Sequence, residues 1–160
     1  MSTLLLGLGN PILGDDGIGP RLAADFAVRL AGRPGLHVEA DCAVGGLELL
    51  DLLAGHERVI VLDALLTRDA RPGAWHAFDA GALRETLHLD NVHDTNFATA
   101  LALGRRLGLP LPDDAAIHIF GVEVADACTF SERLTPALEA AYPVYSEAIF
   151  GELQRLLASA

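Results

Sequence analysis

Two acids and one histidine occupy positions from which they could act on a metal ion or a proton. Asp16 lies in a glycine-rich loop after an apolar run, Asp63 ends a second apolar run, and His93 precedes an amphipathic stretch. Two carboxylates and one imidazole, with no thiolate, suit a borderline divalent metal that keeps an open coordination position. These residue types indicate a metal site or an acid–base site.

Each of these residues also has an ordinary structural explanation. Asp15 or Asp16 could satisfy free N–H groups at a helix start. Asp63 could be a turn acid after a strand, and His93 could be a surface histidine. We expect His118, which alternates within a strand, to be packed or exposed rather than a ligand. Two acids at strand ends together with a histidine before a helix favour a site over three unrelated explanations.

The elements that must position these residues follow from hydrophobic periodicity and from turn residues. Strands are predicted at residues 3–8, 36–41, 58–63, 74–78 and 117–124. Helices are predicted at residues 20–30, 47–53 and 97–107, and from 136 toward 158. Pro20 suits the first position of a helix, and Thr135 suits an N-cap before Pro136. Pro143 is expected to kink or interrupt the last helix.

Strands that alternate with helices predict an α/β fold with a mostly parallel sheet covered on both faces, in one domain over residues 1–160. Right-handed crossovers place the loops after the first three strands along one edge. Asp16 and Asp63 are therefore expected at the same edge, with Asp63 at an exposed strand end.

The glycines of the first loop do not form a dinucleotide-binding fingerprint. Gly7 and Gly9 lack a third glycine three residues later, because Ile12 stands there. Asp15 and Asp16 would also repel a phosphate placed in the loop. The loop suits a cation or a proton.

Composition restricts the partners. The chain has a net charge of −11 with no basic cluster larger than Arg105-Arg106, which argues against nucleic acid. Its apolar runs are too short to span a membrane, and the first strand begins without a basic leader, so a cytoplasmic protein is expected. Cys42 and Cys128 are expected to be two buried thiols rather than a disulfide in that compartment.

The pattern Gly7-x-Gly9-Asn10-x-x-x-x-Asp15-Asp16-Gly17-x-Gly19 resembles the opening signature of the hydrogenase maturation proteases. These endopeptidases trim the large subunit of nickel-iron hydrogenases. The resemblance covers nearly the whole chain. Four later features follow in the same order as in that family. Asp41 precedes Gly45-Gly46 and Leu47-Glu48-Leu49-Leu50, and Asp63 follows Val59-Ile60-Val61-Leu62. His93-Asp94 precedes a helix, and Leu134-Thr135-Pro136 lies near the end.

This resemblance implies a three-layer α/β/α fold of the phosphorylase/hydrolase-like kind. Its mixed, mainly parallel sheet would have five strands, with the strand near Trp75 antiparallel. The resemblance also implies that nickel already bound in the precursor marks the cleavage site, so nickel comes with the substrate and no organic cofactor is needed.

The resemblance assigns the catalytic and metal-contacting roles to Asp16, Asp63 and His93. Many members carry glutamate where this chain has the shorter Asp16. The segment with Asp41 and the Gly45-Gly46 loop is linked to substrate recognition. The implied partner is the [NiFe] hydrogenase large-subunit precursor, and a monomer is expected.

Two other functions are weighed against this one. Peptidyl-tRNA hydrolases open with a similar Gly-Leu-Gly-Asn-Pro motif, but they need a histidine shortly after it, and none lies between Asn10 and His37. The alternative that the sequence leaves open is an assembly chaperone that recognises the nickel-loaded subunit without cutting it.

Overall fold

The computed structural model describes the backbone of residues 1–85 and 92–159 and the side chains of residues 1–83 and 97–159. The strands are β1 (Thr3–Leu8), β2 (Leu36–Cys42), β3 (Arg58–Leu65), β4 (Trp75–Asp79) and β5 (Ile117–Glu123). The α-helices are α1 (Ile18–Arg29), α2 (Leu47–Leu53), α3 (Ala80–Glu85), α4 (Val92–Arg106) and α5 (Pro136–Ala158). Two short 3-10 helices are η1 (Gly14–Gly17) and η2 (Asp114–Ala116).

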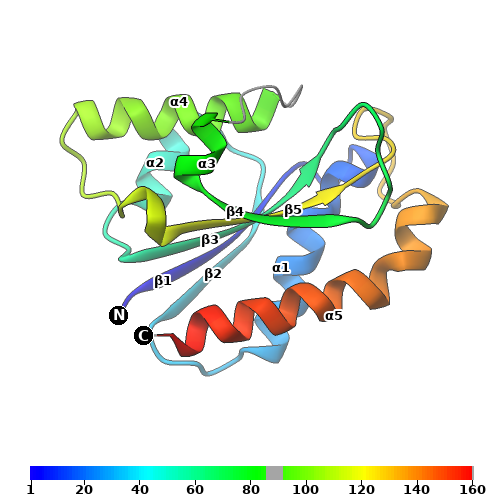
Figure 1. Ribbon diagram of the computed structural model, residues 1–160, viewed down its shortest axis with the longest axis horizontal. Helices are drawn as coiled ribbons and strands as arrows, with labels where there is room; N and C mark the ends of the chain where they lie inside the picture. Colours follow the sequence, from blue (N-terminus) through cyan, green and yellow to red (C-terminus); the bar gives the residue numbers. More distant parts are fainter. Residues whose placement is uncertain (86–91, 160) are drawn as a thin grey trace.

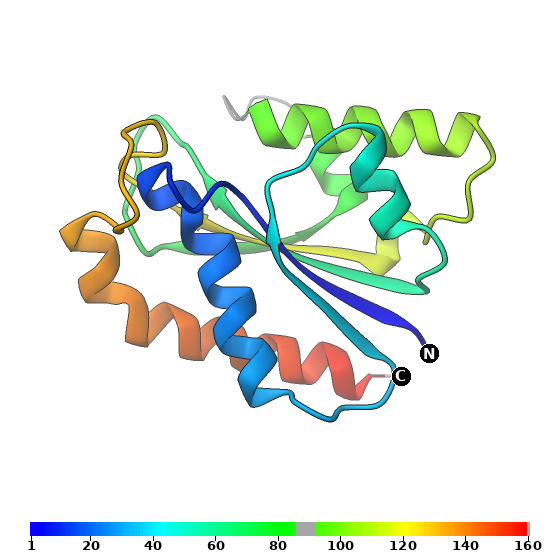
Figure 2. The same ribbon diagram turned by 180° about the vertical axis from the view of Figure 1, so that it is seen from behind.

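The five strands form one sheet in the order β2-β1-β3-β5-β4. Every pair is parallel except β4 with β5, so the predicted mixed, mainly parallel sheet with an antiparallel strand at Trp75 is confirmed. Helices α1 and α5 cover one face of the sheet, and α2, α3 and α4 cover the other (Figure 1; Figure 2 from behind). The α/β/α layering is therefore also as predicted.

Strand β3 shows how the sequence fills both layers. Side chains alternate between the two faces of a strand. Ile60 and Leu62 belong to the apolar cluster beneath α1 and α5, whereas Val59 and Val61 belong to the cluster beneath α2 and α4. The same alternation assigns Asp63 to the face of Val59 and Val61, which α4 covers.

Several boundaries differ from those predicted. Helix α1 begins at Ile18, so Pro20 is its third residue; proline is tolerated there because first-turn N–H groups have no partner in the helix. Helix α4 begins at Val92, five residues early, and includes His93. Helix α5 is not interrupted at Pro143, but its first turns run at an angle to the rest, which agrees with the predicted kink (Figure 1). The short elements η1, α3 and η2 were not predicted.

Gly19 lets α1 approach the sheet closely. A Cβ atom at this position would lie 2.3 Å from the carbonyl oxygens of both Leu8 and Leu62. Only glycine leaves room for that contact. The start of α1 is therefore held against the carboxyl ends of β1 and β3, next to Asp16 and Asp63.

Candidate functional site

Asp16 lies in η1, directly after β1, and is only 2% exposed. Its Oδ2 atom accepts a hydrogen bond of 2.7 Å from the backbone N–H of Asn10. The backbone N–H of Asp16 donates in turn to the carbonyl of Leu13. The loop from Asn10 to Asp16 is thus closed on itself, which fixes the carboxylate at the carboxyl edge of the sheet.

Asp63 is the sixth residue of β3 and is 1% exposed. The prediction that it ends the strand in an exposed position is wrong, because β3 continues to Leu65. Its Oδ1 atom accepts a 2.8 Å hydrogen bond from the N–H of Ala64. Because β1 and β3 are parallel neighbours and η1 packs on β3, Asp16 and Asp63 belong to the same edge of the sheet, as predicted.

The third predicted residue, His93, has a side chain outside the described residues. Its backbone lies in the first turn of α4. The N-terminal end of α4 points toward the same end of the sheet as the carboxyl ends of β1, β3 and β5 (Figure 1). The convergence of His93 with Asp16 and Asp63 stays a prediction. The side chains that the structure describes contain no group of three or more His, Cys, Asp or Glu able to hold a metal.

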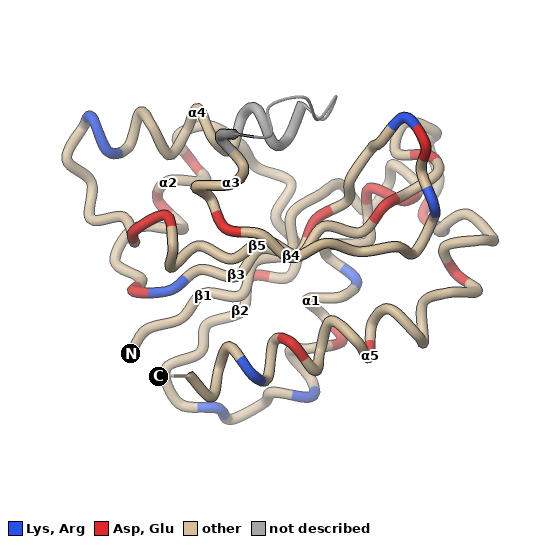
Figure 3. The backbone as a smooth tube through the Cα atoms, in the orientation of Figure 1, with Lys and Arg blue, Asp and Glu red and all other residues tan. Residues whose placement is uncertain are grey.

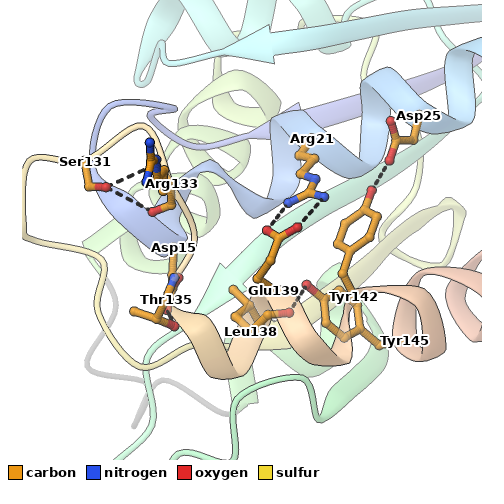
Figure 4. Close-up of polar contacts among 10 residues, drawn as sticks. All are labelled: Asp15, Arg21, Asp25, Ser131, Arg133, Thr135, Leu138, Glu139, Tyr142 and Tyr145. Atoms are coloured by element: carbon orange, nitrogen blue, oxygen red, sulfur yellow. Dashed lines mark hydrogen bonds and ion pairs between the residues drawn. The ribbon is translucent and has the colours of Figure 1, made fainter.

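Asp15 has a different role from Asp16. Its buried carboxylate accepts hydrogen bonds from the N–H and hydroxyl of Thr135, at 2.6 and 2.8 Å, and from the N–H groups of Ala125 and Asp126, at 3.1 and 3.2 Å (the Thr135 contact is drawn in Figure 4). Both carboxylate oxygens are therefore used within the chain. Asp15 anchors the segment between β5 and α5, and we assign it a structural role.

Glu123, the last residue of β5, is a site-edge acid that the sequence analysis did not select. Its carboxylate accepts a hydrogen bond of 2.7 Å from the Thr67 hydroxyl and lies 3.2 Å from His76 Nε2. The Thr67 bond is the main cause of a lowered pKa for Glu123, against the opposing effect of burial. An acid at the end of an apolar strand is the signal that identified Asp63, and it could have identified Glu123 too.

Cys42 ends β2 close to this edge and is a buried free thiol as predicted, whereas Cys128 is free but exposed, so its predicted burial is wrong. Burial raises the pKa of its thiol, and the negative charges of Glu39, Asp41 and Asp63 act in the same direction. A neutral thiol is a poor nucleophile and a poor metal ligand. The chemistry available at this edge therefore comes from oxygen and nitrogen groups, as the residue types predict.

A cleft of about 690 Å³ borders the first loop on the side of α1 and α5. Asp41 lines it, together with Gly14 and Gly17 of η1, Arg21 of α1 and Arg133. A cleft of this size accommodates a short peptide segment. Asp41 is thus accessible to a bound chain.

The Gly45-Gly46 loop follows Asp41 and is exposed, and Gly46 has a φ of 61°. A Cβ atom added to either glycine would have no neighbour within 4 Å. This loop faces solvent, where a partner could reach it.

Acidic residues lie among the loops beyond the carboxyl ends of the strands, where the loop between β3 and β4 also carries Arg68 and Arg71 (Figure 3). The carboxylates at this edge provide oxygen donors of the kind that a cation binds. Across residues 1–85 and 92–159, no helix is long and apolar enough to cross a membrane.

The sheet order and the helices on both faces define a three-layer α/β protein whose candidate site lies at the carboxyl ends of the strands. The fold is that of the hydrogenase maturation proteases. The chain is similar to the hydrogenase maturating endopeptidase HybD from Escherichia coli, with 24% identity, 97% of this chain and 93% of that chain covered, and a TM-score of 0.80.

Two archaeal structures show the same likeness. The [NiFe] hydrogenase maturation protease HybD from Thermococcus kodakarensis has 25% identity, covers 94% of this chain and 98% of its own, and has a TM-score of 0.69. The [NiFe] hydrogenase maturation protease HycI from the same organism has 17% identity and a TM-score of 0.67. The match covers 99% of this chain and 93% of HycI. Neither a protein-family model nor a curated protein sequence matches the chain.

Proposed function

We propose that this protein is an endopeptidase that removes the C-terminal extension of a nickel-loaded [NiFe] hydrogenase large-subunit precursor. The observation that carries the proposal is the pair of buried carboxylates, Asp16 and Asp63, at one sheet edge in this fold. Two buried carboxylates at the carboxyl edge of an α/β sheet are typical of functional sites. The similarity to hydrogenase maturation endopeptidases supplies the substrate class.

The proposed chemistry uses a metal that arrives with the substrate. Carboxylate oxygens from Asp16 and Asp63 and an imidazole nitrogen from His93 would contact the precursor's nickel, and these donor types suit that ion. A bound cation can polarise a peptide carbonyl or lower the pKa of a bound water, and either helps hydrolysis. Because the enzyme contributes only part of the coordination shell, it would cut only a precursor that brings the metal.

The cleft at Asp41, lined by Gly14 and Gly17 of η1, would receive the precursor's chain next to the first loop. Asp41 would bind the extended segment, and the exposed Gly45-Gly46 loop would allow the precursor to approach. No tightly bound metal or organic cofactor of its own is needed for this function. We further propose that the protein acts as a monomer in the cytoplasm.

The test is to incubate the protein with nickel-loaded and with nickel-free precursor and to measure the product masses. The proposal expects loss of the C-terminal extension from the nickel-loaded precursor alone. An Asp16→Asn variant is the matched control, because it keeps the acceptor for Asn10 and loses the charge. Stable binding of the precursor without any cleavage would instead favour the non-cleaving assembly chaperone. Equal cleavage of both precursors would refute nickel dependence.

A further inference from the structure

Two histidine rings meet at the amino end of the sheet, away from the candidate site. His37 is the second residue of β2, and His56 lies in the loop between α2 and β3. Their ring centroids are 5.3 Å apart, and the ring planes are inclined by 62°. Because β1, β2 and β3 are parallel, this end of the sheet is opposite the edge that holds Asp16 and Asp63.

The register of the sheet explains why the two rings meet. His37 is opposite Leu4 of β1, and Leu4 is opposite Val59 of β3. Opposed residues of parallel strands project to the same face, and Leu4 and Val59 belong to the cluster beneath α2 and α4. His37 therefore projects on the side of α2, and the loop that follows α2 carries His56.

The ring of His56 is held with one nitrogen engaged. Its Nδ1 atom lies 2.8 Å from the hydroxyl oxygen of Ser2. Ser2 is itself fixed, because its N–H donates to Glu57 Oε2 at 2.8 Å and its carbonyl accepts from the N–H groups of Glu57 and Arg58, at 2.9 and 3.2 Å. Metal-binding histidines have their second ring nitrogen hydrogen-bonded in this way, which sets the tautomer and the ring orientation. With the Nδ1 proton directed to Ser2, Nε2 is the coordinating atom.

The spacing of the rings matches that of two histidines on one tetrahedral ion. Zinc binds imidazole nitrogen at about 2.0–2.1 Å, which puts each ring centroid about 3.2 Å from the ion and the two centroids about 5.2 Å apart. The centroid of a histidine ring lies almost on the Cβ–Cγ axis. Rotation about χ2, a torsion with a broad distribution, therefore redirects the ring nitrogens and keeps this spacing. His37 is exposed, so its ring can rotate toward the ion.

His56 is a neutral imidazole at pH 7. Burial lowers its pKa, and a positive charge on His37 lowers it further. A histidine must be neutral to bind a metal, so the ion has no proton to displace from His56. The net charge of −11 adds a long-range attraction for cations.

We propose that His37 and His56 form a surface zinc site, with Nε2 of His56 and one ring nitrogen of His37 as the ligands. Water completes the tetrahedron, because the side chains of residues 1–83 and 97–159 contain no group of three or more His, Cys, Asp or Glu able to hold a metal. The ion links β2 to the loop before β3 across β1, so its binding stabilises the fold. It lies at the other end of the sheet from the proposed peptidase site and takes no part in cleavage.

The test is a titration of the full chain with zinc, measured by calorimetry and by the ring resonances of the histidines in NMR spectra. Zinc is expected to shift the resonances of His37 and His56 together. His37→Ala, which removes an exposed ring, should weaken zinc binding by at least about tenfold, and Ser2→Ala should weaken it by about tenfold through loss of the bond that orients His56. His118→Gln, on the opposite face of the sheet, is the matched control and should bind zinc as the parental protein does.

A variant with Asp16→Asn and Asp63→Asn separates this site from the candidate site, whose carboxylates could also bind zinc. The double variant should keep the zinc-induced shifts of His37 and His56. Loss of these shifts in the double variant, or parental zinc affinity in His37→Ala, would overturn the proposal and leave the two rings as a packing contact alone. A protein that binds zinc at His37 and His56 but does not cut the precursor would refute the proposed function and support this site.

Discussion

Thr135 donates two hydrogen bonds to Asp15, one from its backbone N–H at 2.6 Å and one from its hydroxyl at 2.8 Å, across 120 positions of sequence (Figure 4). Thr135 is also the N-cap position of α5, yet its side chain makes no cap hydrogen bond within that helix. The hydroxyl is used by Asp15 instead. A single buried carboxylate thus joins the first loop to the start of the last helix.

Asp15→Asn should therefore destabilise the protein. The amide would turn an NH₂ group toward N–H donors, and the free energy of unfolding should fall by about 2–3 kcal/mol. Asp16→Asn keeps an acceptor for the Asn10 N–H and should cost less stability while removing activity. Denaturant unfolding of Asp15→Asn and Asp16→Asn under the same conditions measures the difference between their losses of stability. Equal losses of stability would contradict the division of roles between these neighbours.

Asp63→Asn should abolish processing and leave the fold intact. The amide oxygen can still accept from Ala64 N, so we expect a stability change of no more than about 1–2 kcal/mol. The charge that attracts a cation is lost, and an amide is a poorer metal ligand than a carboxylate. Cleavage of nickel-loaded precursor, with thermal melting measured in parallel, tests this. Asp51→Asn, on the exposed surface of α2, is the matched control and should cut at the parental rate.

Gly19→Ala should destabilise the protein strongly, because the added methyl group meets the carbonyls of Leu8 and Leu62 at 2.3 Å. We expect a loss of at least about 2 kcal/mol, as for an overpacked core. Gly151→Ala, in α5, has no neighbour within 4 Å and should stabilise by about 0.5–1 kcal/mol through helix propensity. Chemical denaturation measures the free energy of unfolding of both variants. If α1 approaches the sheet this closely, Gly19→Ala lowers that free energy and Gly151→Ala raises it.

Glu123 should make stability depend on pH in the acid range. Its pKa in the folded protein lies below the ordinary value of 4.5, chiefly because of the Thr67 hydrogen bond. The stabilisation is complete above about pH 4.5 and is lost as the pH falls through the folded pKa. Glu123→Gln should lower the melting temperature at pH 7 and have little effect at pH 3. If the melting temperatures of the parental protein and Glu123→Gln differed by the same amount at pH 3 and pH 7, the negative charge of Glu123 would not contribute to stability.

The purified protein should need no metal of its own. After treatment with a chelator that is then removed, it should still process nickel-loaded precursor at its untreated rate. Ligands from separate loops without a thiolate form a weak site until the substrate completes it. Activity that is lost with the chelator and restored only by added metal would point to a resident ion.

Local signals explain which parts of the fold could be predicted. Strand β1 and helix α2 match their predicted ranges at every residue, since each is a clear apolar segment ended by glycine. The start of α4 was placed five residues late because Asp94 and Asn96 are typical of turns. Non-local contacts left no such signal. The bonds from Asp15 to Thr135, and the burial of Asp63 beneath neighbouring elements, depend on segments that meet only after folding.

Helices α1 and α5 are linked by two ion pairs at matching intervals, Arg21 with Glu139 and Arg29 with Glu147. The order of the pairs means that the two helices run in the same direction. Together with α4, they direct their N-terminal ends toward the edge that holds Asp16 and Asp63 (Figure 2). Helix N-termini carry partial positive charge, so the three helices favour the acidic side chains that this edge would present to a cation. This field depends on the direction of the helices and not on their side chains, so a fold shared at 24% sequence identity is enough to set the helix directions that produce it.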